Sequence, residues 1–365
     1  MTKLNAWLAK VAMVISVLGL IVPSNTARAQ AQAPAPAPAD AQTRGVQADL
    51  AFETSEFMRQ TAYRNVSRLD TDDAPDGAYG AVNRAWDLSH QGQWYIEEQR
   101  SGADLINGGL SAGDPEAISR GLHILQWGFR HQNNGGSFSC PDSFHSTSFF
   151  VEACAHSCLL IQASPFAQRF AGQIATMTAQ VQKSALWMVR PDVEPLGRRH
   201  NQPFTHRRYL VACALGETGV LCQDKALIRK SEEYIREGLA LQDPSGFNPE
   251  RDGYDSSYNA VGLFFAERYC TLVAGDDVRA ALRPMLEKGI AWEASRINPD
   301  GTLITTGNTR VGGQITEAAR SGQLKKPAVG QVFRCLAYWS QLSGENSYAA
   351  LADKVAAAAH MSHLK

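Results

Sequence analysis

The stretch SGFNPERDGYDSSYNAVGL (245–263) passes from a loop rich in Gly, Pro and charged residues into an apolar helix. Two other stretches follow the same order, GGSFSCPDSFHSTSFFVEA (135–153) and RRHNQPFTHRRYLVACALG (198–216), and DGTLITTGNTRVGG (300–313) is a divergent fourth case. Equivalent points lie about 50 to 60 residues apart, which is the length of two helices with their loops. A repeat of this period predicts stacked helical hairpins.

Apolar residues recur at helical spacing through most of the chain. The pattern i, i+3, i+4, i+7 is typical of amphipathic helices, and it is found at 49–63, 118–132, 146–162, 167–189 and 278–297. We therefore predict an all-α fold, an (α/α) toroid of about six helical hairpins that forms a single domain over residues 46–365. The distinctive loops all precede the same helix of each hairpin, so a closed ring would gather them at one end. An open solenoid is the structural alternative.

The first 45 residues have the composition of a targeting segment followed by a linker. Residues 1–29 contain a positively charged start, a short apolar run at 11–22 and a small-x-small cleavage pattern that ends at Ala29. This arrangement is typical of a signal peptide, and a retained N-terminal anchor is the alternative. Residues 30–45 are rich in Ala and Pro, as extended linkers are. We expect a periplasmic or secreted protein that does not contact the membrane after cleavage.

Charge and composition limit the classes of partner. The chain of 365 residues is 44% hydrophobic and 19% charged, which suits a globular domain, and its formal net charge is -1. A nearly neutral chain has no general attraction to nucleic acid or anionic membranes, and no nucleic-acid-binding motif is present. The run RRHNQPFTHRR (198–208) is locally basic, which indicates either a solvated loop or the wall of a pocket for an anionic ligand. Histidine spacings typical of metal sites are missing, so we expect no metal and no cofactor.

The stretch at 245–263 also concentrates ionisable and aromatic side chains. Arg251 offers a planar group that matches a carboxylate, and the hydroxyl of Tyr254 or Tyr258 can relay a proton. Asp255 or Ser256 lies at the start of the helix, where either can act as an N-cap. Capping and packing account for Asp255 and Tyr258, but they do not explain why an Arg and two Tyr residues cluster. We therefore expect this loop to line a ligand site as well.

The combination of GGSF, FHSTSFFVEA, GYDSSYNAVGLFF and DGT…GNTR in helical hairpins resembles the toroidal carbohydrate-active proteins. These include six-hairpin glycosidases and lyases that degrade alginate and glycosaminoglycans. In toroidal alginate lyases an Arg stands seven positions before a catalytic Tyr, and Arg251 and Tyr258 have that spacing. His206, followed three residues later by Tyr209, is similar to the family's His and aromatic residue. The resemblance extends over residues 115–340.

One position departs from the lyase pattern. Thr205 stands where the family has an Asn directly before its His. His200 and Asn201 supply the pair nearby, in reversed order. Because the resemblance implies that an Asn helps to neutralise the substrate's carboxylate, Asn201 is our candidate for this role.

The resemblance implies an exported polysaccharide lyase that cleaves a uronate-containing, anionic polysaccharide such as alginate by β-elimination. This reaction needs donors that stabilise a carboxylate dianion, a base, and an acid for the leaving oxygen. Arg251 and Asn201 would neutralise the carboxylate. His206 or His145 would act as base or assist neutralisation, and Tyr258 would act as base or acid. The catalytic candidates are therefore Tyr258, His206, Arg251 and Asn201. The substrate-binding candidates are His145, His200, Tyr254, Asp255, Asp142, Arg207, Asn308 and Arg310.

Two other functions fit the same residues. A toroidal glycoside hydrolase would use paired carboxylates, which in an inverting enzyme lie about 6.5–9.5 Å apart. Asp255 and Asp142, from different loops, are the candidate pair. A glycan-binding protein without activity would use the same loops. At single positions the structural alternatives are also plain: His145 can be a loop histidine bonded to backbone, and Asn308 with Arg310 can be a turn with a surface Arg.

Overall fold

A computed structural model describes residues 41–64, 94–312, 316–319 and 322–362. The chain divides into one unit of residues Met1–Pro38 and a second of residues Ala39–Lys365. All the described residues belong to the second unit, and the fold given below is the fold of that unit.

The beginning of the chain is described only from residue 41. The expected signal peptide (1–29) and most of the expected linker lie outside the described residues. Helix α1 begins at Ala41, so residues 41–45, which we expected to be linker, are helical. The last Pro of the Ala/Pro run is Pro38, and beyond it every backbone N–H can join a helix. None of the helices in the described ranges is long and apolar enough to cross a membrane.

Every regular element in the described residues is a helix. The bounds are α1 (Ala41–Glu53), α2 (Glu56–Gln60), η2 (Ile96–Arg100), α4 (Ser101–Ala112), α5 (Pro115–Arg130), α6 (Ser143–Ala163), α7 (Ala171–Met188), α8 (Glu194–Asn201), α9 (His206–Cys222), α10 (Lys225–Leu241), α11 (Ser256–Leu272), α12 (Asp276–Ala294), α13 (Val329–Ser343) and α14 (Asn346–Ser362). The predicted all-α class is confirmed.

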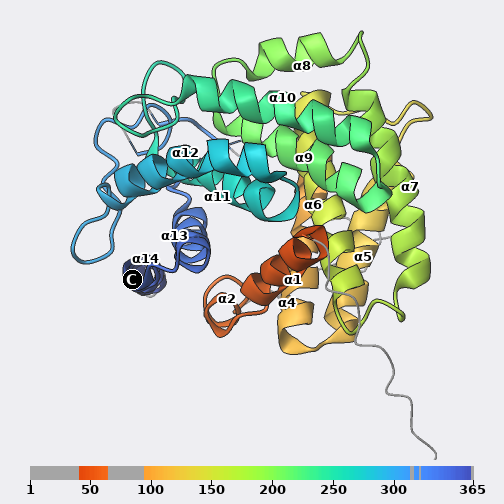
Figure 1. Cartoon of the computed structure of the whole chain (residues 1–365), viewed down its shortest axis with the longest axis horizontal. Helices are drawn as coiled ribbons and strands as arrows, with labels where there is room; N and C mark the ends of the chain where they lie inside the picture. Colours follow the sequence, from red (N-terminus) through yellow and green to blue (C-terminus); the bar gives the residue numbers. More distant parts are fainter. Residues whose placement is uncertain (1–40, 65–93, 313–315, 320–321, 363–365) are drawn as a thin grey trace, which may run out of the picture. The chain divides into compact units, whose positions relative to one another are not determined.

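The helices pair into hairpins that form a ring (Figure 1). Within the described residues the hairpins are α4 with α5, α6 with α7, α9 with α10, α11 with α12, and α13 with α14. The first helices of the later hairpins, α6, α9, α11 and α13, contact one another in that order and form the inner wall. This is the predicted (α/α) toroid, with five hairpins in the described part of the chain where about six were expected.

Burial separates the inner helices from the outer ones. Helix α6 is buried on nearly all sides, from Phe144 to Ile161, whereas α10 buries only a stripe made of Leu227, Ser231, Tyr234, Ile235 and Gly238. A helix that is apolar all round requires neighbours on every side, and a helix with one apolar stripe can cover a surface. The sequence therefore assigns α6 to the inner wall and α10 to the outer layer.

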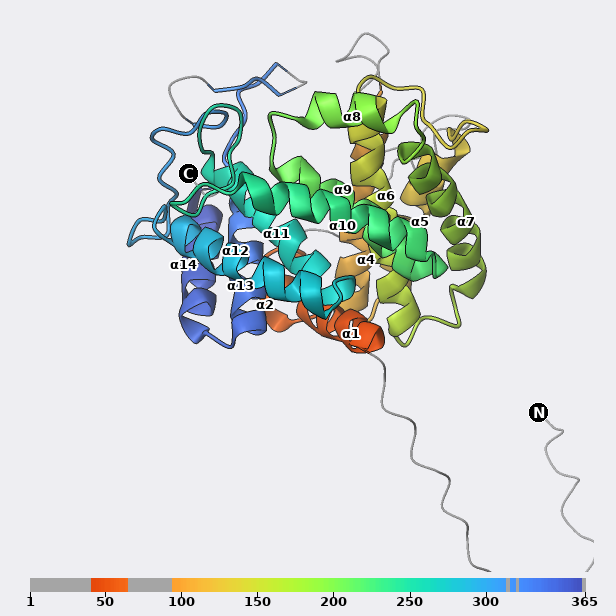
Figure 2. The same cartoon turned by 45° about the horizontal axis from the view of Figure 1, so that its top comes forward.

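Helix α1 closes one end of the ring. Its Gln47 side chain donates to the carbonyl of Ala163 at the end of α6, and Gln341 near the end of α13 donates to the carbonyl of Ala48. Both contacts are with the C-terminal ends of inner helices. The loops that precede the inner helices lie at the opposite end (Figure 2). The predicted convergence of these loops is therefore observed.

One turn occurs three times in the loops that precede inner helices. Gly136, Gly246 and Gly301 all have positive φ, between 87° and 113°. In each turn the Gly N–H donates to a carbonyl three residues earlier, at 2.8–2.9 Å. Each Gly also packs against the outer helix of the hairpin that its loop begins. The repeat read from the sequence thus corresponds to a real turn that attaches each loop to its own hairpin.

Replacing Gly246 by Ala tests this attachment. Its φ is 113°, and an added Cβ would lie 2.6 Å from the carbonyl oxygen of Lys288. We expect Gly246→Ala to lower the free energy of unfolding by about 1–3 kcal/mol, as measured by urea denaturation. Gly172→Ala is the matched control, because nothing lies within 4 Å of its added Cβ and Ala favours the helix. Equal stability of both variants would contradict the assignment.

Candidate active site

The inner helices begin at the end of the ring where the loops gather (Figure 2). A helix N-terminus carries a partial positive charge of about half an elementary charge and unpaired N–H groups. Several parallel N-termini therefore give this end of the toroid a field that favours anions. The candidate site is built from the first residues of these helices and from the loops before them.

Tyr258 lies in the first turn of α11 and is surrounded by cationic groups. The Nζ atom of Lys325 donates to its hydroxyl at 3.0 Å. The guanidinium of Arg310 lies over its ring, 3.6 Å from the centroid, and the ring of His206 is 4.8 Å away. Positive donors in these positions stabilise negative charge that develops on the phenol oxygen.

His206 begins α9 and is held by a buried carboxylate. Its Nδ1 is 2.7 Å from Oε1 of Glu250, and its backbone N–H donates to the same oxygen at 3.0 Å. Arg310 donates to the other oxygen at 3.1 Å. Because the carboxylate accepts from Nδ1, the neutral imidazole keeps its proton there and has Nε2 as an acceptor. Burial lowers the pKa of His206, and the charge of Glu250 only partly opposes this.

The basic residues of the site lie around the ring of Phe204. The guanidinium carbons of Arg207, Arg310 and Arg251 lie 4.3, 4.4 and 5.8 Å from its centroid. The ring of His206 is 6.2 Å from the same centroid. Arg251 and His206 therefore lie within about 12 Å of each other, close enough to act on one substrate.

Glu317 neutralises part of this positive charge. It accepts from Arg310 at 3.0 and 3.2 Å and from Lys325 at 2.9 Å, and it pairs with Arg251. Burial alone would raise the pKa of Glu317, but the hydrogen bonds from Arg310 and Lys325 lower it to about 2. Arg251, which we predicted to neutralise substrate, thus has an internal carboxylate partner, and Arg310 is the arginine that covers Tyr258.

Arg207 is the exception among these cations, because it forms no ion pair with a described residue. Its side chain is buried, with the residue 8% exposed, and it donates to Oδ1 of Asn201 at 2.9 Å. Burial lowers the pKa of its guanidinium to about 10, although Asp142 and Glu250 oppose this. A buried cation with no carboxylate in direct contact is unfavourable. An anionic ligand would supply the missing charge.

Three buried polar atoms around Arg207 have no hydrogen-bond partner in the described part of the chain. They are Nε of Arg207 itself, Nδ2 of Asn201 and Nδ1 of His145. Burial, and after it the charge of Arg207, holds the pKa of His145 well below its usual value. Buried donors are nearly always satisfied in folded proteins. Their shared lack of partners indicates a binding position for a group that accepts hydrogen bonds.

Three of the predicted substrate-binding residues stabilise the loops through contacts within the protein. Asp255 is the N-cap of α11, as its position predicted, and its other oxygen accepts from the backbone N–H groups of Arg310 and Val311. Asn308 bonds to Ser256 and to the carbonyl of Val311. Tyr254 packs against Phe247 and Trp292. The sequence offered these structural roles for Asp255, as an N-cap, and for Asn308, in a turn, beside the binding roles that we predicted.

The other predicted residues lie near the rim. His200 and Asp142 interact with each other at 2.9 Å. The basic run 198–208 is not one loop, because Arg198 and the residues up to Asn201 belong to α8. Arg198 pairs with Glu194 and Glu237, whereas Arg207 lies in the site. The run is therefore divided between the outer layer and the anion-binding position.

Lys325, Glu317 and Phe204 were not among the predicted residues. Lys325 and Glu317 belong to the connection of more than 30 residues between α12 and α13, which contains no helix in its described parts. A connection of that length in a compact fold is usually functional, and this was the available signal. Phe204 stands directly before Thr205 and His206, where an aromatic residue alone suggests only packing.

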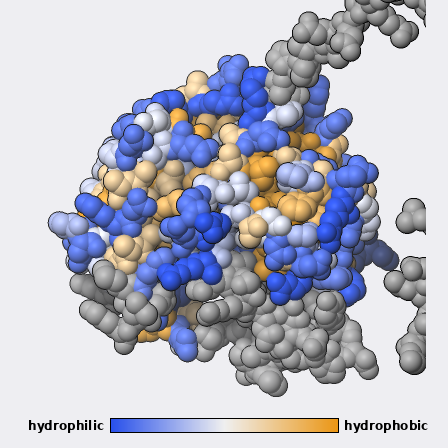
Figure 3. All heavy atoms as spheres, turned by 90° about the horizontal axis from the view of Figure 1, so that it is seen from below, coloured by the Kyte–Doolittle hydropathy of each residue, from blue (hydrophilic) through white to orange (hydrophobic). Residues whose placement is uncertain are grey.

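Two cavities lie away from these side chains. One of about 800 Å³ is lined by residues of α2, α4 and α14, including Tyr63, Ser111 and Asp353. Figure 3 shows the side of the molecule on which these helices lie, with apolar residues in the middle and hydrophilic residues around them. The other, of about 320 Å³, includes Cys270 and Trp339. Neither cavity is lined by Tyr258, His206, Arg207 or any of the side chains that contact them.

Comparisons with known proteins support the fold. No family model matches the sequence, and no curated protein matches it. Among solved structures, a mutant of the chondroitin AC lyase of Streptomyces coelicolor A3 matches with a TM-score of 0.53 and 13% identity. The same lyase in complex with chondroitin sulphate matches with a TM-score of 0.53 and 14% identity. Both matches cover 85% of this chain and 44% of the lyase. This chain therefore shares the toroid fold and spans less than half of that protein's length.

Replacing Glu250 by Gln tests the arrangement around His206. Loss of the charge leaves Arg310 without one of its partners, and we expect a loss of about 2–4 kcal/mol in unfolding free energy. The pKa of His206, already below its usual 6.5 because of burial, should fall further. Below about pH 6.5 the histidine is protonated more fully in the unfolded state than in the folded state. The free energy of unfolding therefore declines as the pH falls, and it declines more steeply in the variant than in the wild type.

The measurements are an NMR titration of the histidines and urea denaturation between pH 5 and pH 8. Asp252→Asn is the control, because Asp252 is exposed on the same loop. An unchanged His206 titration in Glu250→Gln would contradict the proposed contact.

Proposed function

We propose that this chain is a polysaccharide lyase that cleaves a uronate-containing polysaccharide by β-elimination. The observation that carries the proposal is the buried, unpaired Arg207 with the unsatisfied donor of Asn201 beside it. Phe204 links this anion-binding position to Arg310 and so to Tyr258. The fold shared with a chondroitin AC lyase supports the same reaction class, and one structure of that lyase is in complex with chondroitin sulphate.

The first requirement of the reaction is to neutralise the uronate carboxylate. Removal of the adjacent carbon-bound proton places a second negative charge on the carboxylate. Arg207 and the Nδ2 atom of Asn201 would bind that group, and His145 is placed to make a further hydrogen bond. These donors are already desolvated, so they need little reorganisation as the charge develops.

The second requirement is proton transfer, which we assign to Tyr258. As base, Tyr258 acts as a phenolate: its oxygen takes the proton beside the carboxylate and becomes a neutral phenol, and the electron pair of that C–H bond forms a carbon–carbon double bond. The glycosidic C–O bond then breaks, and its oxygen takes a proton from Tyr258. Lys325 and Arg310 stabilise the negative charge that Tyr258 carries before the first proton transfer and again after the second. His206, oriented by Glu250, holds the ring of Tyr258 on its other side and is the alternative base.

The carboxylates of the hydrolase alternative are engaged elsewhere. Asp255 is fully buried and accepts from three backbone N–H groups, and Asp142 bonds to His200. Asp255 is therefore inaccessible to a sugar, and Asp142, whose side chain is partly exposed, is occupied by His200. The N-terminal pattern supports export to the periplasm or the medium, where polysaccharides of this kind are found, and we extend the proposal to include it. Alginate is one candidate substrate within the uronate class.

Activity on a panel of polyuronates tests the reaction class. We expect an increase in ultraviolet absorbance from an unsaturated uronate product with at least one of alginate, chondroitin, hyaluronan and pectate. Tyr258→Phe should lower kcat by about 10²–10⁴-fold, because it removes the group that transfers protons. Tyr348→Phe on the outer helix α14 is the control. New reducing ends without absorbance would instead indicate a hydrolase, and binding without any product a glycan-binding protein.

Replacing Arg207 by Gln tests the anion-binding position. We expect KM for the uronate substrate to rise by about 10-fold or more, since a charge-assisted hydrogen bond contributes about 1.5–3 kcal/mol. Arg199→Gln is the matched control, because Arg199 is exposed on nearby α8. Equal kinetics in the two variants would show that Arg207 does not bind the substrate. A larger effect of Arg199→Gln would indicate that the substrate binds at the exposed surface of α8.

A further inference from the structure

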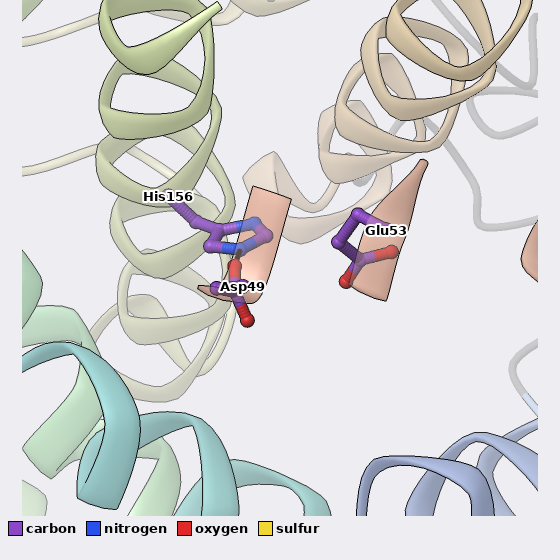
Figure 4. Close-up of side chains that lie close together, drawn as sticks. All are labelled: Asp49, Glu53 and His156. Atoms are coloured by element: carbon purple, nitrogen blue, oxygen red, sulfur yellow. Dashed lines mark hydrogen bonds and ion pairs between the residues drawn. The ribbon is translucent and has the colours of Figure 1, made fainter. Parts of the chain in front are cut away.

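A second group of ionisable side chains lies inside the ring. Asp49 and Glu53 stand one turn apart on α1, and His156 of α6 faces them (Figure 4). The Nε2 atom of His156 is 2.6 Å from Oδ2 of Asp49. One donor atom from each of the three residues lies within 4.8 Å of the others. All three side chains are buried, with at most 2% exposure.

The charges in this region are not balanced. Arg268 of α11 pairs with Glu53 at 3.0 Å and with Glu152 of α6. Three carboxylates, those of Asp49, Glu53 and Glu152, thus face the guanidinium of Arg268. The charge of Arg334 also acts on Glu53, but Arg334 is itself paired with Asp104, so two negative charges remain when His156 is neutral. The C-terminal ends of α6 and α13 point toward α1, and helix C-termini disfavour negative charge. A buried divalent cation would neutralise the group.

A fourth carboxylate independently indicates a missing ligand. Glu217 of α9 is fully buried, and its oxygens accept from no N–H or O–H group of the described residues, with the weakly donating thiol of Cys213 as its hydrogen-bond partner. Its charge interacts with those of Glu152, Arg268 and Asp49, so it faces the same region. A buried carboxylate without a strong donor is unfavourable by several kcal/mol, unless a ligand or ion satisfies it.

The carboxylates of α1 are also oriented by neighbouring hydroxyls. Tyr338 donates to Oδ1 of Asp49, and Tyr63 donates to Oε2 of Glu53. Each carboxylate oxygen has two lone pairs, so these bonds leave acceptor capacity in the direction of His156. Hydrogen bonds to ligating carboxylates are a regular feature of protein metal sites.

We propose that Asp49, Glu53 and His156 bind a divalent first-row metal ion, whose charge would also offset that of the nearby buried Glu217. One imidazole nitrogen with carboxylate oxygens suits Zn²⁺ or Mn²⁺. With bonds of about 2.1 Å, neighbouring ligand atoms lie about 3.4 Å apart. The ion would replace the proton between His156 and Asp49 and draw Glu53 in by about 1 Å. A closed, buried site of this kind is structural, and it is independent of the function proposed above.

Metal content of the full chain tests the proposal directly. The protein is purified without an affinity tag, incubated with Zn²⁺ or Mn²⁺, dialysed, and analysed by mass spectrometry for metals. We expect about one ion per chain. Removal by a chelator should lower Tm by about 5 °C, because a tightly bound ion stabilises only the folded state. Re-addition of the ion should restore Tm.

Variants locate the ion. His156→Gln and Asp49→Asn should each lower metal content by at least 10-fold, whereas His123→Gln, on the exposed face of α5, should retain it. Two variants are used because one of them could fail to fold, which circular dichroism reports. Wild-type protein that binds no ion, or binding that is equal in His156→Gln and wild type, would overturn the proposal. The cluster would then be an ion-paired core with a protonated His156.

Discussion

The buried contact of Arg268 with two carboxylates is the interaction on which the rest of the toroid depends. Arg268 belongs to α11, and its partners Glu53 and Glu152 belong to α1 and α6. Removing one partner of such a group costs about 3–5 kcal/mol, since the remaining charge stays buried. The contact therefore sets the register of two inner helices and the position of α1 at once. A shift of one helix along the ring axis would break it.

The contact of Arg268 lies at the closed end of the ring, which α1 covers. It also determines the arrangement at the open end, where the loops before the inner helices gather. Because the inner helices are held in register by buried ionic groups, their N-termini arrive at the same level, and the loops before them meet. The helix ends and the arginines around Phe204 then make that end attractive to anions. The two ends differ in one respect that matters for function. The cations of the closed end are paired, whereas Arg207 at the open end is paired with no carboxylate of the described residues.

Local chemistry explains the parts that the sequence predicted well. The hairpin repeat was predicted from the stretches 135–153, 198–216 and 245–263, with 300–313 as a divergent case. The turn at Gly136, Gly246 and Gly301, which have positive φ, occurs in the first, the third and the divergent stretch and not in 198–216. Asp255 was expected as an N-cap, and it is one. The inner helices were visible from their continuous apolar character. Five residues assigned to the linker, 41–45, are helical, because the stretch after the last Pro of the run is compatible with either state.

The contacts of the site could not be predicted in the same way. Arg251 and Tyr258 were paired because they are seven residues apart, but Arg251 reaches Glu317, and the ring of Tyr258 is covered by Arg310. Arg310 and Lys325 come from the following loop, more than 50 residues further along the chain. The sequence by itself determined the toroid, its repeated turn and the general place of the site, because these follow from local backbone and burial preferences. Only the tertiary structure decided which arginine is paired and which is left for a ligand, because that depends on distances between separate loops.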